Sequence, residues 1–268
     1  MPDSALSLSS AAIGYDRKLV FEDLSLDIPP GQVTALCGPN GCGKSTALKA
    51  MRRVLPLSRG EASLLDRPLS EWPARELARE LAMLSQTPEA PGEMSVEELV
   101  ALGRYAHRPP LSGRRATDRA AVTAAMSAVD VSDLAARPIG ALSGGQLQRV
   151  WLAMVIAQES PVVLLDEPTN HLDIAHALET LSLVRHLSRA MGKTVVVVLH
   201  DLNLAARFAD RLVFFRAGQI VSQGAVGEVF REEIISEVFG IDCEVRAEGP
   251  EGRPFFLPHH RAVRQAAE

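Results

Sequence analysis

The sequence has few cysteines, no excess of basic charge and no long apolar runs. The three cysteines are an odd number without the spacing of a metal site, which indicates free thiols in a reducing compartment. The formal net charge of −5 argues against a protein whose main task is to neutralise nucleic-acid phosphates. We therefore expect no nucleic-acid partner, although binding a single nucleotide needs only a local pocket.

The apolar runs are too short to cross a membrane as a helix. The longest, Val162 to Leu165 and Val195 to Leu199, have the length of strands, whereas a spanning helix needs about 18 apolar residues or more. Met1 to Ser10 has neither a basic start nor a long apolar stretch, so we predict no signal peptide. We expect a cytoplasmic protein that would serve a membrane only as a peripheral subunit.

Short apolar segments separated by turns predict an α/β fold with a parallel sheet covered on both faces. Strands are expected at Leu6–Tyr15, Leu24–Ile28, Gln32–Cys37, Leu81–Ser85, Val162–Leu165, Thr194–Leu199 and Arg211–Phe215. Gly60 to Leu69 is typical of a hairpin, and a second hairpin is expected at Ala217-Gly218-Gln219.

Helical apolar spacing is concentrated between about residues 87 and 159. It covers Ser95 to Tyr105, Asp118 to Val129 and Gln146 to Gln158, and Ser95 with Glu98 is placed as a capping box. We predict a helical subdomain here, inserted into an α/β domain of residues 1–240. Residues 241–268 would form a short C-terminal extension with a small hairpin around residues 248–253.

A complete phosphate-binding motif follows the Gln32–Cys37 strand. Residues 38–45 match G-x-x-x-x-G-K-[ST] in full, with a predicted helix from Lys44 to Val54 behind them. Glycines let the backbone aim its N–H groups at phosphate oxygens, and the helix N-terminus points to the same place. We expect Lys44 to reach the β- and γ-phosphates of ATP and Ser45 to bind Mg²⁺. The full expected contact set is Gly38, Pro39, Asn40, Gly41, Cys42, Gly43, Lys44, Ser45 and Thr46.

Two acidic residues end the strand Val162 to Leu165. Asp166 is expected to hold Mg²⁺ through water, and Glu167 to polarise the attacking water. Such a pair can instead cap a helix, an alternative that is weaker beside a complete phosphate motif. Within that motif, the thiol of Cys42 lies at a helix N-terminus, so we also expect it to react with maleimide and to be protected by ATP.

The segment Leu142 to Gln146, reading Leu-Ser-Gly-Gly-Gln, begins a predicted helix a little over 20 residues before Asp166. In a chain with a phosphate motif, it resembles the signature motif of ABC ATPases, and the resemblance extends from Tyr15 to about Gly240. This implies a P-loop NTPase core with an antiparallel β subdomain and an inserted helical subdomain that carries the signature. It also implies that Ser143, Gly144, Gly145 and Gln146 face the γ-phosphate of ATP bound by a second, identical subunit.

The resemblance implies roles for four more residues. Tyr15 would stack on adenine, Gln86 would sense Mg²⁺ at the hinge of the helical subdomain, and His200 would contact the γ-phosphate. Asp173 belongs to the D-loop, although its residues Asn170 and His171 depart from the commoner Ser-Ala. Taken alone, a tyrosine, glutamine or histidine at such a position is more often a packing or surface residue than a binding residue. The catalytic set would be Lys44, Gln86, Glu167 and His200, and the metal set Ser45, Gln86 and Asp166.

Two classes of ABC ATPase are compatible with these motifs. Repair proteins carry zinc cysteines or long coiled coils, and translation factors carry two ATPase halves with a basic linker; this chain has none of these, which favours transport. Its partners would be membrane-spanning permease subunits, with an extracytoplasmic binding protein acting indirectly. It would then lie at the cytoplasmic face of the cell membrane.

Four segments resemble the ATPases of ferric-siderophore importers in particular. They are Gly38–Thr46, Leu102–Tyr105, Trp151–Met154 and Leu172–His176. We also expect no β-domain of the kind that sugar importers append. We expect siderophore import, with vitamin B12, haem or a metal ion as alternatives, because none of these residues would touch the cargo.

Two charged features have modest expected roles. The cluster Arg104, Arg108, Arg114, Arg115 and Arg119 is interpreted as a solvated face, with a lipid or permease contact as the alternative. His259 and His260 are expected to be exposed rather than to bind metal.

Overall fold

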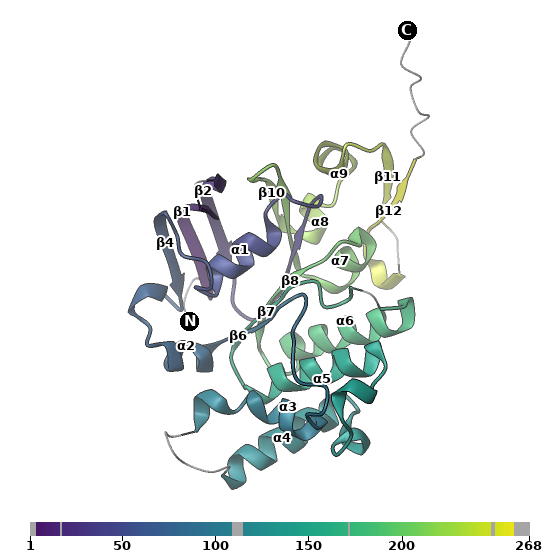
Figure 1. Ribbon diagram of the computed structural model, residues 1–268. Coiled ribbons are helices and arrows are strands. Elements are labelled where there is room, and N and C mark those ends of the chain that lie inside the picture. Colours follow the sequence, from purple (N-terminus) through teal and green to yellow (C-terminus); the bar gives the residue numbers. More distant parts are fainter. Residues whose placement is uncertain (1–3, 17, 109–114, 171, 248–249, 260–268) are drawn as a thin grey trace.

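Two main β-sheets, with helices between and beside them, and a separate two-stranded hairpin build the computed structural model of the chain (Figure 1). The structure describes residues 4–16, 18–108, 115–170, 172–247 and 250–259. Within that part of the chain, no helix is both long enough and apolar enough to cross a membrane.

The smaller sheet is antiparallel, with the strand order β2-β1-β4-β5. Its strands are β1 (Leu6–Tyr15), β2 (Lys18–Ile28), β4 (Arg59–Leu64) and β5 (Arg67–Pro68). This sheet confirms the predicted antiparallel β element. Its β2 begins at Lys18, six residues before the predicted start, because the residues before Leu24 also pair with β1, with Phe21 opposite Ile13 and Lys18 opposite Tyr15.

The larger sheet has the order β10-β9-β3-β8-β7-β6 and is parallel except for its edge strand β10. Its strands are β3 (Val33–Cys37), β6 (Leu81–Leu84), β7 (Val162–Leu165), β8 (Thr194–Val198), β9 (Arg211–Arg216) and β10 (Gln219–Ala225). Strands β3, β7 and β8 are buried along their whole length, as expected for a parallel sheet covered on both faces.

Alternate residues of each central strand enter two separate apolar cores. Leu36 and Val196 pack with α1 (Lys44–Met51) and the small sheet on one face. Ala35 and Val197 pack with the remaining large helices on the other. Figure 1 shows α1 between the two sheets, so the loop that precedes α1 is held from both sides.

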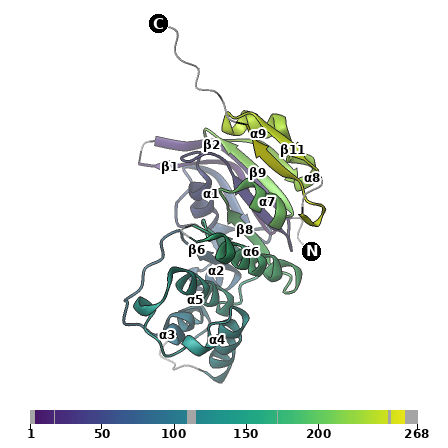
Figure 2. The ribbon, with the colours of Figure 1, turned by 90° about the vertical axis from the view of Figure 1, so that its right-hand side faces the viewer.

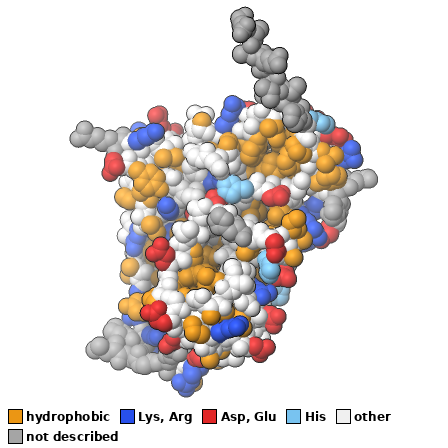
Figure 3. Space-filling model, turned by 45° about the vertical axis from the view of Figure 1, so that its right-hand side comes forward, with side chains coloured by type: hydrophobic (Ala, Val, Ile, Leu, Met, Phe, Trp, Pro, Cys, Tyr) orange, Lys and Arg blue, Asp and Glu red, His pale blue; other side chains and the backbone are white. Residues whose placement is uncertain are grey.

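The other helices divide into predicted and unpredicted ones. Predicted were α3 (Val96–Leu102), α4 (Ala116–Ala128) and α5 (Gly144–Ala157), which pack together at one end of the molecule (Figure 2). Not predicted were α2 (Ala74–Glu80), α6 (Ile174–Arg189), α7 (Leu202–Phe208), α8 (Val226–Val229) and α9 (Glu232–Phe239). Strands β11 (Cys243–Arg246) and β12 (Phe255–Pro258) form the hairpin predicted for the tail, and apolar side chains gather on the surface in this region (Figure 3).

The expectation of a solvated basic face is wrong for Arg104. Its side chain is buried, and Nε lies 3.3 Å from Asp118 Oδ1. Its Nη1 donates to Glu159 Oε2 at 2.6 Å and to the Ala157 carbonyl at 2.7 Å. Burial acts to raise the pKa of Asp118, but hydrogen bonds from the Arg115 backbone and from Arg104 hold that pKa below its usual value. Arg104 therefore joins α4 to the end of α5.

The rest of the basic cluster is mixed. Arg108 is partly buried and lies 3.8 Å from Asp118, whereas Arg115 and Arg119 are exposed. Arg114 lies outside the described residues, as does His260, and His259 is exposed. The sequence showed the cluster of charges but not that a carboxylate in α4 would turn Arg104 inward.

Candidate functional site

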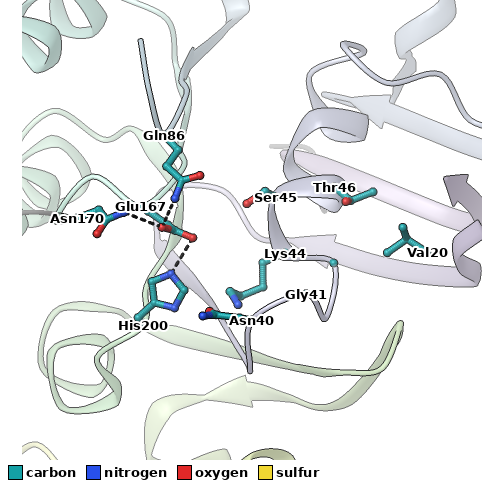
Figure 4. A pocket seen from close by; sticks show the side chains of 11 residues that line it. Val20, Asn40, Gly41, Lys44, Ser45, Thr46, Gln86, Glu167, Asn170 and His200 are labelled. Atoms are coloured by element: carbon teal, nitrogen blue, oxygen red, sulfur yellow. Dashed lines mark hydrogen bonds and ion pairs between the residues drawn. The ribbon is translucent and has the colours of Figure 1, made fainter. Parts of the chain in front are cut away.

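A pocket of about 690 Å³ lies at the carboxyl ends of the parallel strands (Figure 4). It is lined by Val20, Asn40, Gly41, Gly43, Lys44, Ser45, Thr46, Gln86, Glu167, Asn170 and His200. Ligands bind at this edge of open parallel sheets because the loops after the strands meet there. The pocket collects most of the predicted phosphate, metal and catalytic residues from four separate segments.

The phosphate loop joins β3 to α1 and depends on glycine at two close contacts. Gly38 has φ 151°, and a Cβ there would lie 2.3 Å from the Phe215 carbonyl oxygen. Gly43 has φ 110°, and a Cβ there would lie 2.4 Å from the Phe21 ring. Any side chain at either position would displace the loop, so these glycines fix the curve of the backbone around the pocket.

Lys44 is the first residue of α1 and is buried. Its Nζ donates to the carbonyls of Gly38 at 2.7 Å and Pro39 at 3.0 Å. The first N–H groups of α1 have no acceptor within the helix, and its dipole adds positive potential at the same end. The loop thus combines a fixed ammonium with free backbone donors, which is the chemistry of a phosphate site.

Ser45 lines the pocket, and its Oγ donates to Asp166 Oδ1 at 2.8 Å, although Asp166 is not itself among the described residues that line the pocket. Asp166 follows β7 and is almost completely buried. Burial raises the pKa of its carboxyl, while the Ser45 hydrogen bond lowers it and the Glu167 carboxylate raises it further. A hydroxyl and a carboxylate beside a phosphate site are the oxygen ligands that Mg²⁺ takes, together with phosphate and water oxygens. These two residues fit the ion.

Glu167 is at the centre of a polar cluster. Its Oε2 accepts from Gln86 Nε2 at 2.6 Å and from Asn170 Nδ2 at 3.3 Å, and its Oε1 lies 2.7 Å from His200 Nε2. Figure 4 shows these side chains converging on the carboxylate from different elements. The backbone of Glu167 has φ 52°, an uncommon conformation outside glycine that directs this side chain into the pocket.

Two further residues qualify the predicted site. Asn170 was assigned only to the D-loop, and its contact with Glu167 was not predicted; its position three residues after Glu167 was the available signal. Tyr15 is 45 % exposed at the end of β1, and it is not among the residues that line the pocket, whereas Val20 of β2 is. Adenine stacking on Tyr15 stays a prediction.

The signature segment lies apart from this pocket. None of the described pocket-lining residues comes from 143–146. Ser143 instead caps α5, its Oγ accepting from the Gln146 N–H at 3.3 Å and its own N–H donating to Gln146 Oε1 at 3.1 Å. A Cβ at Gly144 would meet nothing within 4 Å, so this helix N-terminus is open. The segment is therefore not part of the pocket formed by the phosphate loop of its own chain.

The burial of Cys42 argues against its predicted reactivity with maleimide. Its side chain is 3 % exposed and packs in the core on the small-sheet side, with Sγ 3.8 Å from Lys44 Nζ. The loop turns the thiol into this core, and Cys42 is not among the described residues that line the pocket. The other cysteines, Cys37 and Cys243, are buried as well, and burial raises the pKa of Cys37 to about 12.

We therefore expect maleimide to label the native protein at least about 100-fold more slowly than the unfolded protein, because labelling requires local opening. Mass spectrometry of samples quenched in native buffer and in denaturant measures both rates. Fast native labelling that ATP suppresses would instead restore the reactive-thiol prediction.

Comparison with known proteins identifies the family. The model of the ABC transporter family matches residues 21–170. The ferric enterobactin transport ATP-binding protein of Escherichia coli is 42% identical over 255 residues, covering 95% of this chain and 94% of that protein. The hemin import ATP-binding protein of Shewanella denitrificans is 43% identical over 244 residues, covering 89% and 94%.

A solved structure agrees with these sequence relatives. A dimeric ATP-binding cassette in a post-hydrolysis state, bound to ADP and Pi, matches with a TM-score of 0.73 at 26% identity, covering 82% of this chain and 98% of that one. The likeness shows that the two chains share a fold. The chain therefore belongs to the ABC transporter family of ATP-binding proteins, whose members hydrolyse ATP to power transport.

Proposed function

We propose that this chain is the ATP-hydrolysing subunit of an importer of ferric siderophores. The observation that carries the proposal is the Glu167 cluster beside a complete phosphate loop, in a chain that matches a ferric enterobactin transport ATP-binding protein over nearly its whole length. The site supports the ATPase chemistry, and the relative supports the cargo.

In the proposed reaction, Lys44 and the N–H groups of α1 bind the β- and γ-phosphates of ATP. Ser45 and Asp166 would hold Mg²⁺, which when bound offsets the negative charge of those phosphates. Glu167 accepts the proton of the attacking water, and Gln86 and His200 hold its carboxylate in place through their contacts of 2.6 Å and 2.7 Å. Phosphoryl transfer of this kind depends mostly on such positioning and charge stabilisation.

The assembly would be a homodimer. The signature segment does not line the pocket formed by the phosphate loop of its own chain. The binding site for the γ-phosphate would therefore be completed by Ser143, Gly144, Gly145 and Gln146 of a second subunit. A relative with this fold forms a dimer. Two ATP molecules would then close the dimer, and hydrolysis would open it. We also propose that residues 1–240 are the ATPase domain, 87–159 its helical subdomain and 241–268 an extension.

Permease subunits would dock beside the Gln86 segment. A cavity of about 490 Å³ there is lined by Arg52, Arg53, Val54, Ala74, Leu77, Met83 and Ser85. Val54, which lines this cavity, is 64 % exposed. The side chain of Arg104 is buried. It is therefore not available for the permease contact that was the alternative interpretation of the basic cluster. Docking here would hold the chain at the cytoplasmic face of the membrane.

Growth on defined iron sources tests the cargo. A strain that lacks the protein should fail to grow with a ferric siderophore as the sole iron source. The intact copy should restore growth, and a Glu167→Gln copy should not. Growth with haem as the iron source, and cobalamin-dependent growth, should be unaffected.

The pattern of growth defects also tests the alternatives. Loss of haem use alone would assign the chain to hemin import, which the Shewanella denitrificans relative performs by name. Loss of cobalamin or metal-ion uptake would assign it to those cargoes. A defect in none of these conditions would favour a non-transport ATPase.

A further inference from the structure

The imidazole of His176 lies against the signature segment. A Cβ added to Gly145 would be 2.7 Å from His176 Cδ2 and 3.0 Å from its Nε2. His176 belongs to the first turn of α6, and Gly145 to the first turn of α5. The contact therefore joins the N-termini of two helices, and it leaves no room for a side chain at position 145.

Asp173 holds His176 through two hydrogen bonds, one to its backbone and one to its ring. It caps α6, its Oδ1 accepting from the His176 N–H at 2.9 Å, while its Oδ2 accepts from His176 Nδ1 at 2.8 Å. These two hydrogen bonds, backbone first, hold the pKa of Asp173 below its usual value. With Nδ1 bonded, the ring cannot rotate freely, and its opposite edge, with Cδ2 and Nε2, faces Gly145.

Two more contacts hold α5: one joins it to α6, and the other joins it to the segment after β7. Arg149 Nη1 lies 3.3 Å from Glu179 Oε2, one turn further along both α5 and α6. Gln148 Nε2 donates to the Pro168 carbonyl at 2.8 Å, one residue after Glu167. Figures 1 and 2 both show α5 and α6 side by side. The signature helix is thus attached to the segment that carries Glu167.

We propose that His176 is a positioning residue for the signature motif: its ring, fixed by Asp173, braces the first turn of α5 at the place where the second subunit's γ-phosphate binds. The inference rests on the dimer of the proposed function. A brace is needed there because an open helix N-terminus with two glycines has little side-chain packing of its own. The D-loop residue Asp173 then acts through His176 rather than on ATP directly.

A simpler role for His176 would be to stabilise α6 alone, and two substitutions separate the roles. His176→Asn keeps an amide nitrogen near the position of Nδ1 for Asp173 but removes the edge that touches Gly145. His176→Ala removes both. A brace predicts that both variants weaken ATP-driven dimerisation, whereas a helix cap predicts that the Asn variant behaves as the parent.

The experiment uses the Glu167→Gln chain, in which ATP is retained. Light scattering over a concentration series with ATP and Mg²⁺ gives the dimer dissociation constant, and a fluorescent ATP analogue gives the affinity of the phosphate loop. We expect His176→Ala and His176→Asn each to raise the dimer dissociation constant about tenfold, with nucleotide affinity unchanged. His186→Ala, an exposed histidine on the same helix, is the matched control and should change neither.

A double-mutant cycle adds a readout that a merely structural role would not move. Gly145→Ala should weaken dimerisation strongly when His176 is present, because the new methyl meets the ring at 2.7 Å. In the His176→Ala background the same change should cost about tenfold less. If the effects of Gly145→Ala and His176→Ala on the dimer dissociation constant are additive, or if both His176 variants dimerise normally, the inference about His176 is overturned. Neither result would contradict the proposed dimer. If the parent Glu167→Gln chain stays monomeric with ATP, the proposed dimer itself fails.

Discussion

Changing Glu167 to glutamine should slow steady-state ATP hydrolysis at least about 100-fold, the usual contribution of a general base, while ATP still binds. The substitution keeps the size of the side chain and its ability to accept hydrogen bonds from Gln86 and Asn170. It removes the negative charge and the site that would take a proton from water. The effect should therefore fall on the chemical step, with little change in nucleotide affinity.

Phosphate release under saturating ATP measures the rate, and equilibrium titration with a fluorescent ATP analogue measures binding. Glu61→Gln serves as the matched control, because Glu61 is exposed on β4, far from the pocket, and should leave both unchanged. Hydrolysis within a few-fold of the parent would show that Glu167 is not the base. Loss of binding would show that the carboxylate holds the pocket together rather than acting on water.

The parts of this site that could be predicted are those determined by local spacing. The phosphate loop needs glycines at fixed positions followed by a lysine, and the contacts of Gly38 and Gly43 show why no other residue fits. The acidic pair after β7 follows from a buried strand that ends at the pocket. Each of these signals is contained in a short stretch of sequence, so it can be recognised without knowledge of the fold.

What could not be predicted depends on neighbours that are distant in sequence. The burial of Arg104 needs Asp118 and Glu159, which lie on other elements. The inward turn of the Cys42 thiol depends on the core that α1 makes with the small sheet. Helix α6 was missed, although Asp173 caps it in the ordinary way, because its first residues were interpreted only as a functional loop.

Changing Lys44 to alanine should have the second large effect, lowering ATP affinity about 100-fold, as expected when a buried charge-assisted contact to phosphate is removed. The ammonium is held at the pocket wall by the Gly38 and Pro39 carbonyls, so its charge is already oriented when ATP arrives. Its removal also takes the ammonium donor from both carbonyls, of which Pro39 keeps the Cys42 N–H, and this should relax the loop. Hydrolysis should fall with binding, and growth on the siderophore should be lost.

Lys49→Ala is the matched control for this effect. Lys49 carries the same charge on the same helix, in its last turn, so it tests whether general positive potential near the pocket is sufficient. We expect it to bind ATP within about threefold of the parent, because Lys49 is partly exposed and is not among the described residues that line the pocket, although its charge acts on Asp166. Isothermal titration with ATP and Mg²⁺ gives both affinities. Equal losses in the two variants would mean that Lys44 acts only through long-range charge, and that its contact with the loop has no part in holding phosphate.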